Sequence, residues 1–520
     1  MRRRPPGLPL LLAAVGGLLT WGAFPGAGPW WAAVPGVALF YLAVVGTRPR
    51  YGAFLGLVYG VAFLLPHLSW AGIYVGWFPL AALVAAEALF YGLGGSLTAL
   101  VSRHPLWLRA IGTASVWVAL EAARARFPFG GFGWGRLAFS QADAPTLGLA
   151  ALGGAPLVSF AVVLGAVLLA EAVMAVLRRR GALKPVVLLA CVAAVLLVGL
   201  AVPRPTVAED GTRHVAGIQG NVPRAGLDFN AERRAVLDNH AAVTQHLAGQ
   251  VRENSSPQPD LVVWPENASD IDPLRNLDAH AVIDSAVADI AAPTLVGTLL
   301  VDDQGHVRNT TLVWDPATGP GEQYVKRHPV PFAEYVPYRD FFRRITPLVD
   351  LVRADMVAGD RVGVLDVAGT RVGDLICFEV VEDGLVADTV RNGAQLFVVQ
   401  TNNATFGYTD ESVQQLAMSR VRAVEHGRAV VHVSTVGVSA MIEPDGTVVD
   451  SSKLFTPAVL QAELPLRTST TLATRLGAWP EALLAAGGIL CAVAGTGAAT
   501  RAIRRIERAR GVRRGRGADA

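Results

Sequence analysis

The sequence predicts a polytopic α-helical membrane bundle of eight spans joined to an α/β domain that lies outside the cytoplasm. Hydrophobic residues make up 52% and charged residues only 17% of the 520 positions, and the mean hydropathy is +0.40. The apolar residues concentrate in 1–203 and 479–498, whereas 204–478 has the composition of an ordinary globular domain. The formal charge of +3 is too small to indicate a nucleic-acid partner, because the arginines lie beside apolar runs.

A membrane-spanning helix needs about 20 mostly apolar residues. Seven stretches before position 204 and one stretch after 478 meet this requirement: 7–24, 29–46, 51–72, 78–100, 106–123, 154–177, 185–203 and 479–498. The basic start of the chain followed by an apolar run also fits a cleaved signal peptide. Because further apolar segments follow, we expect the first stretch to be a membrane anchor.

The orientation of the bundle follows from its basic residues, since short cytoplasmic loops collect Lys and Arg. With a cytoplasmic N-terminus and eight spans, five basic clusters fall on the cytoplasmic side: 2–4, 48–50, 103–109, 178–184 and the tail 499–520. Only the loop 124–145 departs from this pattern, with Arg124, Arg126 and Arg136. We therefore expect 204–478 to lie outside the cytoplasm and the basic tail to be disordered.

Two features of the predicted bundle are open to two interpretations. His67, Glu87, Glu121 and Glu171 lie in or near spans, where an ionisable group is either functional or simply paired inside the bundle. The aromatic and glycine-rich loop 127–141 is either an interface element beside a lipid site or an aromatic belt.

The segment 204–478 alternates short apolar runs with amphipathic stretches, which is typical of a layered α/β domain. The expected strands are 214–222, 260–267, 292–300, 310–316, 372–379, 394–403 and 429–437, and the expected helices are 230–252, 276–291, 380–392 and 411–427.

Three reactive side chains stand at or near the ends of expected strands: Glu266, Lys326 and Cys377, with Glu334 eight residues after the lysine. A carboxylate can take the proton of a thiol, and an ammonium can stabilise the oxyanion of a tetrahedral intermediate. The backbone N–H of Phe378 is a candidate second oxyanion donor. Taken singly, a lone cysteine on a buried strand is more often a packing residue. Glu266 alone could be a helix cap, and Lys326 alone could be the ion-pair partner of a neighbour. The combination of the three is what favours acyl transfer.

The segments that carry these residues resemble the nitrilase superfamily, whose catalytic set is Glu, Lys and Cys. They are IQGNVP (218–223), WPEN (264–267), KRHPVPFAEYVP (326–337), GDLICFE (373–379) and TNNATFG (401–407). Together with the span pattern, they resemble more narrowly the apolipoprotein N-acyltransferase family, over essentially the whole chain. The resemblance implies a nitrilase-like αββα sandwich at 204–478, a seven-span region at 1–203 and an eighth span at 479–498.

The resemblance also implies the role of each residue. Glu266 would be the general base, Lys326 the stabiliser of the transition state and Cys377 the nucleophile. Glu334 would orient the lysine, and Glu379 matches another glutamate associated with activity. Phe378 stands where the family commonly has a tyrosine, so a phenolic hydroxyl is missing there, and Phe229 matches an aromatic position with the spacing off by one.

The implied enzyme is an acyltransferase of the bacterial inner (cytoplasmic) membrane that needs neither cofactor nor metal. Cys377 would accept an acyl chain from a phospholipid as a thioester and pass it to the α-amino group of the diacylglyceryl-cysteine of a lipoprotein. Both partners are held in the bilayer, which raises their effective concentration at a tethered site. Cys377 would stay unpaired to carry the acyl group, and because Cys191 and Cys491 fall in predicted spans, we expect no disulfide.

Three other functions are alternatives to acyl transfer. A membrane-anchored nitrilase-type amidase would use the same residues with a different acceptor. A non-enzymatic membrane scaffold would act through the outer domain or the tail. A transporter ranks lowest, because the spans show no evident repeat.

Overall fold

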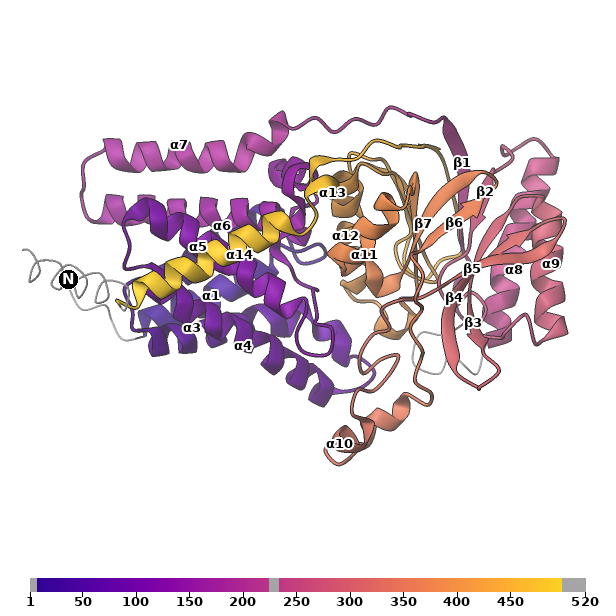
Figure 1. Cartoon of the computed structure of the whole chain (residues 1–520), viewed down its shortest axis with the longest axis horizontal. Helices are drawn as coiled ribbons and strands as arrows, with labels where there is room; N and C mark the ends of the chain where they lie inside the picture. The colour runs from indigo at the N-terminus through magenta and orange to yellow at the C-terminus, as the bar shows by residue number, and fades with distance from the viewer. Residues whose placement is uncertain (1–6, 224–232, 498–520) are drawn as a thin grey trace, which may run out of the picture.

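The computed structural model describes residues 7–223 and 233–497. The predictions that concern Arg2, Arg3, Arg4, Phe229 and the basic tail 499–520 fall outside these residues. Figure 1 shows two units side by side: a helical bundle, and a domain in which strands are covered by helices.

Eight α-helices form the bundle: α1 (Leu8–Trp21), α2 (Ala33–Val44), α3 (Pro49–His67), α4 (Trp77–Val101), α5 (Leu106–Arg124), α6 (Ala150–Leu177), α7 (Leu183–Leu197) and α14 (Trp479–Gly495). Short 3₁₀ turns join or extend them: η1 (Trp30–Ala32), η2 (Ser69–Gly72), η3 (Leu137–Gln141), η4 (Pro145–Leu149) and η5 (Val198–Ala201). Helix α14 returns from the other end of the chain to pack against α5 (Figure 1). Helices α3 and α4 approach closely through glycines, since a Cβ at Gly56 would stand 2.1 Å from the carbonyl oxygen of Tyr91.

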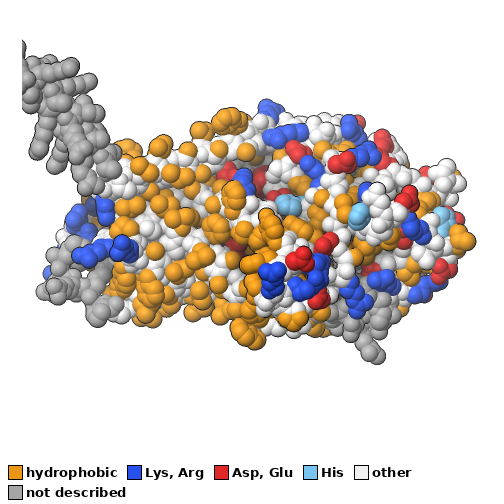
Figure 2. Space-filling model, turned by 60° about the horizontal axis from the view of Figure 1, so that its bottom comes forward, with side chains coloured by type: hydrophobic (Ala, Val, Ile, Leu, Met, Phe, Trp, Pro, Cys, Tyr) orange, Lys and Arg blue, Asp and Glu red, His pale blue; other side chains and the backbone are white. Residues whose placement is uncertain are grey.

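The surface of the bundle half is broadly apolar, whereas side chains of both charges cover the domain half (Figure 2). Among the described residues, four helical stretches are long and apolar enough to cross a membrane: Trp77–Val101, Leu106–Arg124, Pro145–Leu177 and Leu183–Ala201. Three further apolar helices, Leu8–Trp21, Trp30–Val44 and Trp479–Gly495, are shorter. Four of the eight expected spans are therefore supported by helices of sufficient length and hydropathy. Helices α1, α2 and α14 are too short, and α3 is long enough, with 19 residues, but is not among the four.

The domain contains two six-stranded sheets. The first has the order β12-β1-β2-β3-β4-β5 and the second the order β11-β10-β9-β8-β7-β6. The strands of the first sheet are β1 (Thr212–Gln219), β2 (Leu261–Val263), β3 (Thr294–Val301), β4 (Val307–Asp315), β5 (Gly319–Val325) and β12 (Ala458–Pro465). Those of the second are β6 (Val364–Val367), β7 (Thr370–Ile376), β8 (Leu396–Thr401), β9 (Val430–Ser434), β10 (Ala440–Ile442) and β11 (Val448–Ser451).

The two sheets pack face to face, with a core that includes Val263 and Leu295 from the first and Ile376 and Val398 from the second. Helices α8 (Arg233–Arg252) and α9 (Leu277–Ile290) cover the outer face of the first sheet. Helices α11 (Asp383–Arg391) and α12 (Glu411–His426) cover the outer face of the second. These layers form the αββα sandwich that the sequence predicted. The remaining short helices are α10 (Arg339–Arg343), η7 (Pro347–Leu351), η8 (Cys377–Val381), η9 (Ala404–Phe406) and α13 (Leu472–Leu476).

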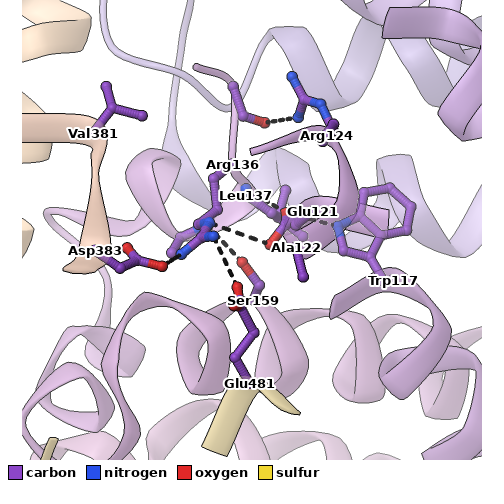
Figure 3. Close-up of polar contacts among 12 residues, drawn as sticks. Trp117, Glu121, Ala122, Arg124, Arg136, Leu137, Ser159, Val381, Asp383 and Glu481 are labelled. Atoms are coloured by element: carbon purple, nitrogen blue, oxygen red, sulfur yellow. Dashed lines mark hydrogen bonds and ion pairs between the residues drawn. The ribbon is translucent and has the colours of Figure 1, made fainter. Parts of the chain in front are cut away.

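The layer of α11 and α12 lies between the second sheet and the bundle (Figure 1), and one apolar core runs through both units. A buried ionic cluster also crosses this junction (Figure 3). Arg136, on the loop after α5, donates to Asp383 Oδ2 at 2.6 Å and to Glu481 Oε1 at 3.0 Å. Glu121 of α5 accepts from the backbone N–H of Leu137 at 2.8 Å. The glutamate in this predicted span is thus engaged inside the protein, and the loop arginine joins α5, α11 and α14.

Substituting Arg136 should weaken the junction of bundle and domain. Its side chain is 3% exposed, and Arg136→Leu removes a shared partner of Asp383 and Glu481, which then keep, among the described residues, only Arg422 and Arg126. The expected cost is about 3 kcal/mol. Thermal unfolding of the detergent-solubilised protein should begin at a clearly lower temperature. The control Arg361→Leu removes an arginine that is 70% exposed and paired with Glu322, where the expected loss is below about 1 kcal/mol. Equal melting of the two variants would contradict a structural role for the cluster.

Candidate active site

The predicted catalytic side chains Glu266, Lys326 and Cys377 follow the ends of strands β2, β5 and β7. Strands β2, β3 and β5 run in the same direction, since β3–β4 and β4–β5 are antiparallel pairs. Glu266 follows β2, and Lys326 directly follows β5. Lys326 Nζ lies 3.3 Å from Glu266 Oε1 and 2.8 Å from Glu334 Oε1. Glu266, 60 residues before the lysine, and Glu334, 8 residues after it, therefore meet at one buried ammonium.

The ammonium of Lys326 stays charged in spite of its burial. Its side chain is 2% exposed, and burial by itself lowers the pKa of a lysine. The carboxylates of Glu334 and Glu266 outweigh this effect, and the pKa of Lys326 lies well above its usual value. The site therefore holds a permanent positive charge.

In addition to Lys326, two hydrogen-bond donors hold the Glu266 carboxylate in a fixed orientation. Asn309 Nδ2 donates to its Oε1 at 2.7 Å, and the backbone N–H of Asn402 donates to its Oε2 at 2.9 Å. Asn309 also donates to Glu334 Oε1 at 3.1 Å, so it bridges both carboxylates. Asn309 was not predicted as a site residue, because no pattern along the chain distinguishes it.

Cys377 begins the turn η8 directly after β7, with a φ of 56°. This left-handed conformation is unfavourable for a residue with a side chain and is found preferentially at functional sites. Burial raises the pKa of the Cys377 thiol, the Glu266 carboxylate raises this pKa further, and the Lys326 ammonium lowers it. Glu266 and Lys326 thus shift the pKa of the thiol in opposite directions, as expected of an anion and a cation near it.

Glu379 fixes the turn that carries the thiol. One carboxylate oxygen accepts from the backbone N–H of Ile376 at 2.8 Å, and the other accepts from the N–H groups of Arg327 and His328 at 2.7 and 3.2 Å. Tyr324 donates its hydroxyl to the same carboxyl group at 3.0 Å. Burial raises the pKa of Glu379. Its contacts tie the nucleophile turn to the lysine segment, which makes it a positioning residue.

Phe378 points away from this polar cluster toward the bundle. Its ring stacks on Trp134 with centroids 5.9 Å apart and on Phe132 at 5.6 Å, both in the loop after α5. The residue next to the nucleophile is therefore anchored in the bundle. Cys191 is exposed on α7 and Cys491 is half-buried on α14, and all three cysteines are free.

The assembled groups form a site for acyl transfer. A carboxylate is available to accept the thiol proton, and a permanent cation is available to stabilise a developing oxyanion. The described residues contain no group of three or more His, Cys, Asp and Glu side chains that could hold a metal ion.

Comparisons with known proteins find relatives of both the bundle and the domain. The profile of the apolipoprotein N-acyltransferase N-terminal domain matches residues 16–168, and the carbon-nitrogen hydrolase profile matches residues 231–474. The chain is 43% identical to the apolipoprotein N-acyltransferase of Mycolicibacterium smegmatis, over 92% of this chain and 84% of that protein. It is 32% identical to the apolipoprotein N-acyltransferase of Azotobacter vinelandii, over 84% of this chain and 85% of that protein.

Among solved structures, an amidase from Nesterenkonia sp. covers 51% of this chain and 95% of its own, with 18% identity and a TM-score of 0.36. The sequence relatives carry the assignment, since they match both the bundle and the domain. The chain belongs to the apolipoprotein N-acyltransferase family.

Proposed function

We propose that this enzyme transfers an acyl chain from a membrane phospholipid, through a thioester on Cys377, to the α-amino group of the diacylglyceryl-cysteine of a lipoprotein. One observation carries the proposal: a half-buried thiol beside a carboxylate and a buried ammonium, on a domain whose helix layer packs onto an apolar bundle. An enzyme acting on small soluble amides would have no use for that bundle.

In the first half-reaction, Cys377 Sγ attacks the carbonyl carbon of a phospholipid ester. Glu266 accepts the thiol proton, and the oxyanion is stabilised by the Lys326 ammonium and the backbone N–H of Phe378. The carbon–oxygen bond then breaks, and the proton passes from Glu266 to the lysophospholipid alkoxide. The acyl group remains on sulfur as a thioester.

In the second half-reaction, the amine of the lipoprotein cysteine attacks the thioester carbon. Glu266 accepts a proton from the attacking nitrogen, the carbon–sulfur bond breaks, and the proton returns to the departing sulfur of Cys377. An amide is formed and the free thiol is regenerated. Water must be excluded between the two steps, because it would hydrolyse the thioester.

The proposal includes an arrangement in the bacterial inner membrane. Residues 1–203 and the helix at 479–498 would form eight spans, in which the shorter helices are completed by their flanking segments, and 204–478 would be the catalytic domain on the extracytoplasmic face. The basic residues at 48–50, 103–109 and 178–184 support this orientation, since cytoplasmic loops collect positive charge.

Incubation with a phospholipid radiolabelled in its acyl chains should leave label on the wild-type protein but not on Cys377→Ala. The label should be released by neutral hydroxylamine, which cleaves thioesters. If no acyl-enzyme forms while small amides are hydrolysed in a Cys377-dependent manner, the amidase alternative would be correct instead.

The charges beside the thiol predict opposite shifts in its titration. The Glu266 carboxylate raises the pKa of Cys377 and the Lys326 ammonium lowers it. Glu266→Gln should therefore move the alkylation of Cys377 by iodoacetamide to lower pH, and Lys326→Met should move it to higher pH. Both variants should still lose acyl transfer by about 100-fold or more, because the proton acceptor or the oxyanion stabiliser is gone. The exposed control Glu253→Gln should change neither property; shifts in the same direction would refute the assigned charges.

The orientation can be measured with single cysteines in a background where all three native cysteines are replaced by serine. Leu277, on α9, is 86% exposed, and Arg180 is exposed between α6 and α7. A membrane-impermeant maleimide should label Leu277→Cys on intact spheroplasts and should label Arg180→Cys only after permeabilisation. The reverse pattern would place the domain in the cytoplasm.

A further inference from the structure

A second hydrogen-bonded system, separate from Glu266 and Lys326, reaches the thiol from the side of α12. Its members are Thr401, Asn403, Glu411, Gln415 and Ser434, which come from the ends of β8 and β9 and from α12. All five side chains are buried. Gln415 Nε2 lies 3.6 Å from Cys377 Sγ, which is within the range of hydrogen bonds to sulfur.

Backbone N–H groups at one end of this system orient the Asn403 amide. Ser434 Oγ accepts from the backbone N–H groups of Gly437 and Val436 at 2.7 and 3.3 Å, which fills both acceptor sites of the hydroxyl, so its hydrogen goes to Asn403 Oδ1 at 2.5 Å. The amide nitrogen of Asn403 must then be the donor on its other side. It donates to Gln415 Oε1 at 3.0 Å and to Glu411 Oε2 at 2.7 Å.

The same argument orients the amide of Gln415. Its oxygen accepts from Asn403 Nδ2 and from Thr401 Oγ1, the latter at 2.8 Å. A flipped amide would place its nitrogen against the nitrogen donor of Asn403. The N–H₂ group of Gln415 is therefore the part that faces sulfur. Thr401 Oγ1 lies 3.4 Å from the same sulfur, and its single hydrogen is taken up by the shorter bond to Gln415.

Glu411 is the hydrogen-bond acceptor for the Asn403 amide nitrogen in this system. Burial raises its pKa to about 8, the Asn403 hydrogen bond lowers this pKa, and the Glu266 charge raises it.

We propose that Gln415 is a further catalytic residue, whose amide N–H donates to Cys377 Sγ and stabilises the sulfur anion as it attacks the ester and as it leaves the thioester. Asn403 is the positioning residue that sets the orientation of the Gln415 amide, with Ser434 and Glu411 holding Asn403. The role in turnover rests on the proposed acyl transfer. The hydrogen bond to sulfur does not, and it can be tested on the free enzyme.

The test measures the rate of Cys377 alkylation by iodoacetamide against pH, with the full-length enzyme in detergent micelles and Cys191 and Cys491 replaced by serine. Gln415→Leu removes the donor, so the profile should move by about one unit toward alkaline pH, a roughly tenfold slower alkylation near neutrality. Gln415→Asn keeps an amide but withdraws it by one methylene, and it should show the same direction of change. It serves as the measurement if the leucine variant does not fold.

Two comparisons separate this role from a purely structural one. Gln414→Leu makes the same exchange one position earlier on α12. The buried Gln414 amide accepts from Trp134 Nε1 and does not contact the thiol. The alkylation profile of this variant should match that of the parent. Glu411→Gln retains an oxygen acceptor for Asn403 and removes a carboxylate whose charge raises the pKa of Cys377, so its profile should not move toward alkaline pH. Profiles of Gln415→Leu and Gln415→Asn that coincide with that of the parent would overturn the proposal. A shifted profile without any acyl-enzyme from phospholipid would leave it standing and reject the proposed function.

Discussion

The buried ammonium of Lys326, held between two carboxylates beside a thiol, is the interaction on which the rest of the structure depends. Two negative groups stabilise one positive group, so Lys326 keeps its charge in a place where burial alone would remove it. The same arrangement opposes ionisation of Cys377, because burial and the nearby Glu266 raise the pKa of the thiol. A standing thiolate is thus disfavoured. In the proposed mechanism, proton transfer to Glu266 during the attack resolves this conflict, since the carboxylate would lose its charge as the sulfur gains one.

The fold makes this arrangement possible by placing strand ends from two sheets opposite one another. Glu266 and Lys326 belong to the first sheet, and Cys377 belongs to the second. Glu379 connects the two through backbone N–H groups of the lysine segment and the nucleophile turn. On its other side the nucleophile turn is joined to the bundle, since Phe378 stacks on Trp134. The catalytic centre therefore cannot shift relative to the bundle without disturbing aromatic and ionic contacts, which suits an enzyme whose proposed substrates are both held in the bilayer.

Much of this organisation could be predicted from the sequence, because it follows from patterns along the chain. Apolar runs and alternation predicted the helical bundle, the seven strands β1–β4 and β7–β9 and four domain helices. Strands β5, β6, β10 and β11 were missed because they are short or largely polar, whereas β12 was missed although it has eight mostly apolar residues. Glu334 contacts Lys326 Nζ at 2.8 Å, and its orienting role stays a prediction. What could not be predicted depends on tertiary structure: Asn309 and Gln415 are ordinary polar residues until the fold places them against Glu266 and Cys377. Likewise, Arg136 looked like an exception to the charge pattern, whereas it is a buried partner of Asp383 and Glu481.

The most direct test of the account uses the purified enzyme in phospholipid vesicles with a synthetic diacylglyceryl-cysteine peptide that has a free α-amino group. Mass spectrometry of the peptide, with fragmentation to locate the added group, measures the final product and does not depend on trapping an intermediate. The account predicts a mass gain of one acyl chain on the α-nitrogen with the wild-type enzyme, and an unmodified peptide with Cys377→Ala, Glu266→Gln or Lys326→Met. An unmodified peptide with the wild-type enzyme, or acylation that persists in Cys377→Ala, would contradict it.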